Sequence, residues 1–138
     1  MSSLSRYVEK WLAGELELAP VTELLGVRPV ALGEGEARIE MTAGKAHHNA
    51  MGTVHGGILC DLADVAMGAA LATATKEGES FTTLQLQMSY FLPVVEGRLQ
   101  AHARVVRRGR GTAHLECDLE DGEGKLVARA TSVCAIRQ

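Results

Sequence analysis

The sequence predicts an α+β fold, in which an antiparallel sheet of five or six strands wraps around one long central helix. Four segments alternate apolar and polar residues with the period of two that half-buried strands show, and a fifth, 126–136, is apolar on both faces, which suits a central strand. The four alternating segments are 36–41, 83–91, 98–106 and 112–120. Their connections are short and glycine-rich, so we expect consecutive strands to pair antiparallel.

Residues 57–76 form the only long interior segment with a helical pattern. It is apolar nearly all round, and such a helix is buried rather than laid on a surface. The sheet must therefore curl around the helix to hide it. A single curled sheet leaves the helix and one sheet edge only half covered, and open edges are usually paired or blocked. We expect a homodimer joined edge to edge.

The N-terminal residues precede this core as a separate helical segment. Residues 1–20 carry an amphipathic helical pattern, and Pro20 suits the first turn of a short second helix that Gly26 ends. A strand at 27–33 then turns into the next strand. We expect a helical extension over residues 1–20 and one domain over residues 21–138.

Composition limits the possible partners and locations. With 138 residues, 46% hydrophobic residues and a net charge of -3, the chain has no electrostatic reason to bind nucleic acid. Asp61 and Asp64 interrupt its longest apolar run, and the N-terminus lacks the layout of a signal peptide, so no membrane association is expected. Three widely spaced cysteines among apolar neighbours indicate reduced thiols. We expect a cytoplasmic protein.

Asp64 is unusual because it lies inside this apolar helix. It is about two turns too deep to cap the helix, a role that suits Thr53 or the glycine pair better. A buried carboxylate needs partners or a shifted pKa, so a functional role and a satisfied structural role both stay open. Nearby residues of metal-binding type match no zinc motif, and we expect no metal site. They are His47, His48, His55 and Cys60.

Gly56 and Gly57 open the helix. Glycines here let a ligand approach the backbone, and the free N–H groups favour negative charge. Such amides stabilise an oxyanion, although a tight turn alone would also explain the pair.

These residues together resemble the signature of hotdog-fold acyl-CoA thioesterases. The matching residues are Asn49-x-x-Gly52-x-x-His55-Gly56-Gly57 followed by Leu62-Ala63-Asp64. The resemblance covers residues 21–138 and is nearest to the phenylacetate-pathway (PaaI-type) group of the 4-hydroxybenzoyl-CoA thioesterase superfamily. It implies a hotdog fold and homodimers, often paired into homotetramers, with sites at the dimer interface.

The resemblance also implies roles for individual residues. Asp64 takes the place of the catalytic carboxylate, as general base or nucleophile, and the Gly56 backbone N–H that of the group polarising the thioester carbonyl. Asn49 and His55 match positions that orient substrate or water and buttress the loop. Thr83 matches a hydroxyl that positions water from the neighbouring subunit.

Substrate contacts follow from the same comparison. We expect Gly57, Met67 and Leu84 to contact the substrate, with an acyl pocket that includes Met67, Leu71, Leu84 and Leu86. The arginines of the turn at 107–110 suit coenzyme A phosphates, although a solvated hairpin would carry the same charges. These arginines are Arg107, Arg108 and Arg110. Coenzyme A enters only as part of the substrate, and no cofactor is expected.

The predicted function is hydrolysis of acyl-CoA thioesters to free acid and coenzyme A. A thiolate leaves readily, so a base or nucleophile and an oxyanion donor suffice, and the strand serines lack a GxSxG elbow. Two alternatives stay open. One is an acyl-thioester hydratase or dehydratase that uses His55 with Asp64. The other is a non-catalytic acyl-CoA-binding module.

Overall fold

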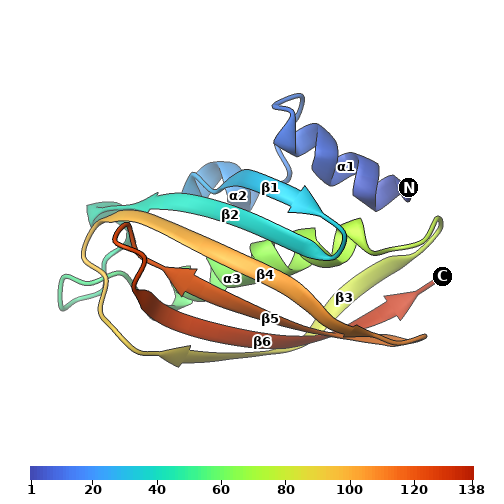
Figure 1. Ribbon diagram of the computed structural model, residues 1–138. Coiled ribbons are helices and arrows are strands. Elements are labelled where there is room, and N and C mark those ends of the chain that lie inside the picture. Colours follow the sequence, from blue (N-terminus) through green and yellow to red (C-terminus); the bar gives the residue numbers. More distant parts are fainter.

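The computed structural model describes residues 1–138 and shows a six-stranded antiparallel sheet curled around one long helix (Figure 1). The predicted α+β class is confirmed. The helices are α1 (Ser3–Leu12), α2 (Pro20–Leu25) and α3 (Gly56–Thr73), with a short 3₁₀ turn at Lys45–His47. The strands are β1 (Arg28–Gly33), β2 (Glu36–Ala43), β3 (Ser80–Tyr90), β4 (Gly97–Arg108), β5 (Thr112–Glu120) and β6 (Leu126–Arg137).

The strand order is β1-β2-β4-β5-β6-β3. The pairs β1–β2, β4–β5 and β5–β6 are antiparallel neighbours, as predicted. The expectation that β3 pairs with β4 is wrong, because β3 pairs with β6 and β4 pairs with β2. The connection between β3 and β4 runs over residues 91–96 and includes Pro93. Because β5 and β6 lie between β4 and β3 in the sheet, this connection is a crossover rather than a tight hairpin turn.

The core lies between α3 and the concave face of the sheet. The alternation predicted for β2, β4 and β5 is confirmed, because their apolar positions are buried and the intervening ones face outward. Within one chain α3 is covered on one side only, as expected for a single curled sheet. One side packs on the sheet through residues such as Leu62, Ala66 and Ala70, whereas Asp61 and Asp64 lie on an open side. By length and composition α3 could cross a membrane, but half of it is buried inside the protein, which accounts for its apolar character.

A β-bulge interrupts β3 and changes which residues face the helix. Thr83 pairs with Cys134 and Gln85 with Val133, so Leu84 is an extra residue without a partner. The regular alternation predicted over 83–91 would place Leu84 and Leu86 on one face. The bulge instead turns Leu84 outward, with 62% of its surface exposed, and leaves Thr83 partly covered on the helix side.

The N-terminal extension packs onto the same body. Trp11 of α1 joins the single hydrophobic core, and the Ser2 hydroxyl lies 2.7 Å from the Thr75 hydroxyl just beyond α3. The short helix from Pro20 ends at Gly26 in a left-handed conformation, as predicted. The division at residue 20 stays a prediction.

Candidate active site

The first turn of α3 is capped by His55. Its Nδ1 accepts a hydrogen bond from the Gly57 N–H at 3.0 Å, so the ring proton sits on Nε2. Our expectation of Thr53 or the glycines as the cap is wrong, because Thr53 bonds to Asn49 instead. The Gly56 N–H has no hydrogen-bond partner in the chain. This amide is therefore free to receive an acceptor.

Asn49 holds the loop that leads into α3. Its Oδ1 accepts from the Met51 N–H at 2.9 Å and the Thr53 N–H at 3.2 Å. Its Nδ2 donates to the Thr53 hydroxyl at 3.0 Å. The side chain is thus occupied within the loop, and a contact of Asn49 with substrate stays a prediction.

The neighbouring histidines also serve the loop. His48 Nε2 lies 2.6 Å from the Val95 carbonyl, and His47 Nδ1 accepts from the Gly44 N–H at 3.0 Å. No group of three or more potential metal-binding side chains converges in the chain.

Asp64 lies on the open side of α3 and is exposed in the single chain, contrary to the expectation that it is buried. The Thr83 hydroxyl donates to Asp64 Oδ1 at 3.2 Å. The resemblance implied that Thr83 acts from a neighbouring subunit, whereas this contact is made within one chain. The bulge in β3 is its cause, because it leaves Thr83 on the side facing α3. Asp64 Oδ2 makes no hydrogen bond within the chain.

Asp61 shares this open side of α3 one turn before Asp64. Partial burial, and then the charge of Asp64, raise the pKa of Asp61 above its usual value. Asp61 makes no side-chain hydrogen bond, whereas Asp64 has the Thr83 hydroxyl. The two carboxylates are thus distinguished by their partners.

The two principal predicted groups are not brought together in one chain. Gly56 and Asp64 are eight residues apart on one helix, which places them about 12 Å apart along its axis. A single thioester carbonyl cannot contact both.

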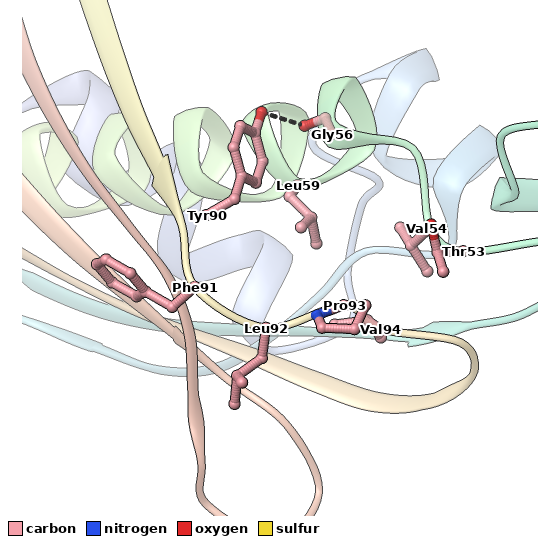
Figure 2. Close-up of a pocket in the computed structure, with 9 residues that line it drawn as sticks. All are labelled: Thr53, Val54, Gly56, Leu59, Tyr90, Phe91, Leu92, Pro93 and Val94. Carbon is pink, nitrogen blue, oxygen red and sulfur yellow. Dashed lines mark hydrogen bonds between the residues drawn. The ribbon is translucent and has the colours of Figure 1, made fainter. Parts of the chain in front are cut away.

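An apolar cavity of about 290 Å³ adjoins Gly56. Figure 2 shows its walls, which come from the loop before α3, the first turns of α3 and the segment after β3. The lining residues are Thr53, Val54, Gly56, Leu59, Tyr90, Phe91, Leu92, Pro93 and Val94. Sequence reasoning missed residues 90–94, although an apolar run with a proline just beyond a strand was a usable signal.

Tyr90 joins this cavity to Gly56. Its hydroxyl donates to the Gly56 carbonyl at 2.9 Å and lies 3.2 Å from Cys60 Sγ. Burial, followed by the contact with Cys60, raises the pKa of Tyr90 to about 12, so the phenol keeps its proton at neutral pH.

The predicted acyl contacts lie elsewhere. Met67 is fully buried in the core, where its sulfur is 3.3 Å from the Ser132 hydroxyl. Leu84 points outward at the bulge. Neither lines the cavity beside Gly56. Gly57 borders a different, more polar recess with Asp61.

The predicted phosphate-binding arginines separate into two kinds. Arg108 forms an ion pair with Glu79, whose side chain is 3% exposed. Arg107 and Arg110 are exposed and form no ion pair in the chain. Their turn lies at the C-terminal end of α3, because Glu79 lies in the α3–β3 connection, whereas Gly56 is at the other end (Figure 1). Within one chain, Arg108 is a structural residue.

Comparison with known proteins supports this architecture. The sequence pattern of the thioesterase superfamily matches residues 51–128. Human acyl-coenzyme A thioesterase 13 is 26% identical over 132 residues, which are 94% of either chain. A phenylacetic acid degradation-related protein of Ralstonia eutropha JMP134 superposes with a TM-score of 0.85 at 32% identity, over 94% of this chain and 98% of that one.

A variant of the phenylacetic acid degradation protein PaaI from Thermus thermophilus is also similar. It has a TM-score of 0.79 and 35% identity, over 85% of this chain and 98% of the other. Together these likenesses confirm the predicted hotdog fold and the PaaI-like character of the chain.

Proposed function

Since this chain belongs to the thioesterase superfamily, we propose that it hydrolyses acyl-CoA thioesters to a free acid and coenzyme A. The proposal rests on two groups of α3, a free backbone N–H and an accessible carboxylate. The Gly56 N–H is free at the start of the helix, and Asp64 presents a carboxylate oriented by Thr83 on the open side. The human relative named above carries the same activity in its name.

The reaction needs few groups. Asp64 removes a proton from water as the water oxygen adds to the thioester carbonyl, or attacks that carbon itself to give an acyl–aspartyl anhydride, which water hydrolyses to the free acid after coenzyme A has left. The Gly56 N–H stabilises the oxyanion that develops. The C–S bond then breaks, and coenzyme A leaves as a thiolate that takes up a proton. Because Thr83 bonds to one carboxylate oxygen, the other is available for water or substrate.

We further propose that the working form is a homodimer. Gly56 and Asp64 of one chain are about 12 Å apart along α3, so a complete site pairs Gly56 of one chain with Asp64 of another. The strand β3 is a free sheet edge next to this region, and its exposed Leu84 suits a contact with a second copy. Pairing of dimers into a homotetramer is part of the same proposal.

The cellular location is also part of the proposal. All three cysteines are free thiols, and Cys117 and Cys134 are buried. Unpaired thiols suit the reducing cytoplasm.

A hydratase or dehydratase mechanism has less support. It needs His55 to act beside Asp64, but His55 Nδ1 is taken up by the Gly57 N–H. Release of free thiol from acyl-CoA separates hydrolysis from hydration.

The test is a panel of phenylacetyl, hydroxybenzoyl and straight-chain acyl-CoAs, assayed for thiol release by wild type and by Asp64→Asn. We expect kcat to fall by roughly 10²-fold or more, because general-base assistance of this kind is worth 10²–10⁴-fold. Asp61→Asn is the matched control, since it removes a carboxylate from the same open side of α3 and should change kcat less than about twofold. Full hydrolysis by Asp64→Asn would contradict the mechanism. Binding without thiol release by wild type would instead indicate a binding module.

A further inference from the structure

Asp64, Thr83 and Cys134 form a row of side chains contributed by α3, β3 and β6. The Thr83 hydroxyl donates to Asp64 Oδ1 at 3.2 Å, and the Sγ atom of Cys134 lies 3.7 Å from the same hydroxyl oxygen. Thr83 and Cys134 are opposed in the register of β3 and β6, immediately before the bulge. The backbone pairing of the two strands therefore places the thiol beside the hydroxyl.

The number of protons sets the direction of both contacts. An ionised carboxylate only accepts hydrogen bonds, and a threonine hydroxyl carries a single proton. Because that proton is donated to Asp64, the Thr83 oxygen has no proton left for the sulfur atom. The Cys134 S–H is then the donor in the second contact. The row of hydrogen bonds runs in one direction, from the Cys134 thiol through the Thr83 hydroxyl to the Asp64 carboxylate.

The Cys134 thiol keeps the proton that this contact needs. Only 1% of the residue is exposed. Burial, and to a smaller extent the charge of Asp64, raise the pKa of the Cys134 thiol above its usual value, against the opposing hydrogen bonds of Thr83 and Ser132. The thiol is therefore protonated at neutral pH and can donate.

The surroundings of Cys134 contain one other polar side chain on the inward face of β6. Two alanines and an isoleucine share this buried face with Ser132 and Cys134. The Ser132 hydroxyl donates to the Met67 sulfur on α3 at 3.3 Å. Its proton is therefore directed to α3, and Cys134 is the side chain that supplies a proton to Thr83.

We propose that Cys134 is a positioning residue for hydrolysis, because its thiol orients the Thr83 hydroxyl that holds the Asp64 carboxylate on the open side of α3. Without the thiol, the Thr83 oxygen loses its donor, and its own proton is less firmly directed at Asp64. The inference rests on the proposed thioesterase function. It gives a task in the site to a cysteine for which the sequence indicated only a reduced thiol.

The first experiment removes the donor at Cys134. Cys134→Ala and Cys134→Ser both lose the sulfur atom, but only Cys134→Ser keeps a proton to donate. We expect Cys134→Ala to lower kcat by about three- to fivefold with KM within about twofold, which is the effect of one weak neutral hydrogen bond. Cys134→Ser should lower kcat by less than about twofold. An equal loss in both variants, or no loss in Cys134→Ala, would overturn the positioning role.

Cys117→Ala is the matched control. Cys117 is buried to the same extent on β5, and its thiol reaches only the carbonyl of the next residue, Asp118, at 3.9 Å. Loss of this thiol should lower Tm about as much as Cys134→Ala does, because both leave a small cavity in the core, but it should leave kcat unchanged. An equal loss of kcat in Cys117→Ala would show that packing, rather than the hydrogen bond, explains the effect.

The second experiment observes the thiol proton by infrared spectroscopy and needs no turnover. The S–H stretching band moves to lower frequency when a thiol donates a hydrogen bond, and the Cys134 band is identified by its loss in Cys134→Ala. We expect this band to move to higher frequency in Thr83→Val, which removes the acceptor and keeps a branched side chain. The bands of Cys60 and Cys117 should stay in place. An unchanged Cys134 band in Thr83→Val would show that the thiol does not donate to Thr83.

The two experiments together separate this inference from the proposed function. If wild type hydrolyses acyl-CoA but the Cys134 band does not move, the positioning role is wrong and the function stands. If the band moves but wild type releases no thiol from any acyl-CoA, the hydrogen bond exists, whereas the function and the role of Cys134 in it are wrong.

Discussion

The two ends of α3 differ in how their polar groups are satisfied. At the C-terminal end, the Glu79 carboxylate accepts from the Lys76 N–H at 2.5 Å and pairs with Arg108, and Ser2 bonds to Thr75. At the N-terminal end, the Gly56 N–H has no partner, and an apolar cavity lies beside it. Hydrogen bonds and an ion pair connect three segments of the chain at the C-terminal end, whereas the Gly56 N–H at the N-terminal end has no acceptor.

This difference shows that formal charge alone does not identify the group that can bind an anion. The arginines of the β4–β5 turn suggested a phosphate site, but Arg108 is used to close the far end of the helix. The free donor that suits an anion is instead a backbone amide, which carries no formal charge. Three experiments test this contrast, from the largest expected effect to the smallest.

The largest effect is expected from Gly56→Pro. Proline suits the first position of a helix and removes the backbone N–H there, and the extended conformation of His55 is compatible with a following proline. Loss of one oxyanion donor should lower kcat by roughly 10²–10³-fold. The change in kcat for the preferred acyl-CoA is the measurement, with thermal unfolding to confirm that the protein folds.

Co-expression of Gly56→Pro with Asp64→Asn tests whether the site is shared between chains. Randomly formed mixed dimers contain one site with both groups intact, so about a quarter of wild-type activity should return. A site within one chain would give no recovery. Tyr90 stands close to the new Cβ, so Gly56→Ala, which keeps the N–H, controls for that contact. It should lose much less activity than Gly56→Pro.

An intermediate effect, on stability rather than activity, is expected at the closed end. The Lys76 N–H, and then Arg108, hold the pKa of Glu79 below its ordinary value, against the opposing effect of burial. The ionised Glu79 carboxylate therefore contributes fully to the stability of the folded protein above the ordinary pKa of about 4.3. This contribution is lost as the pH falls through the lower folded-state pKa. Glu79→Gln should lower Tm by at least roughly 4 °C near pH 7, and the difference should shrink as the pH falls below about 4.

Glu77→Gln is the control for this experiment. Glu77 lies two residues earlier in the same connection and pairs with Arg6 at the surface, where both side chains are more than half exposed. Exposed pairs contribute little. A Glu79→Gln variant as stable as Glu77→Gln would show that the two ends of α3 do not differ in this way.

The smallest effect is expected from the two exposed arginines. Arg107→Ala and Arg110→Ala should each raise KM for acyl-CoA by about two- to fivefold if a partner chain's substrate reaches this turn, and the effect should weaken at high salt. The matching acyl-pantetheine, which lacks the nucleotide phosphates, should show no change. Equal KM values for wild type and both variants on acyl-CoA would remove these residues from the substrate site.

Local patterns in the sequence predicted most of the elements. Alternation located β2, β4 and β5, and Pro20 and Gly26 located α2. These succeed because side-chain periodicity and backbone preferences are properties of neighbouring residues. The resemblance supplied the family, and the comparisons confirm it.

The errors concern properties that depend on distant segments. Alternation gives no sign of the bulge in β3, because the extra residue is defined only against β6. Apolarity could not show which side of α3 the sheet covers, and Asp64 lies on the side that the sheet leaves open. The hydrogen bond from Thr83 to Asp64 depends on both features.

The sequence by itself determined the α+β class, the central helix and the motif that places Gly56 and Asp64 eight residues apart on it, because these follow from residue order and local conformation. Only the tertiary structure decided that His55 caps the helix, that Arg108 forms an ion pair with Glu79 and that Tyr90 donates a hydrogen bond to Gly56. Each of these last two contacts joins residues about thirty positions apart in the chain. They form only when the curled sheet brings these segments to the two ends of one helix.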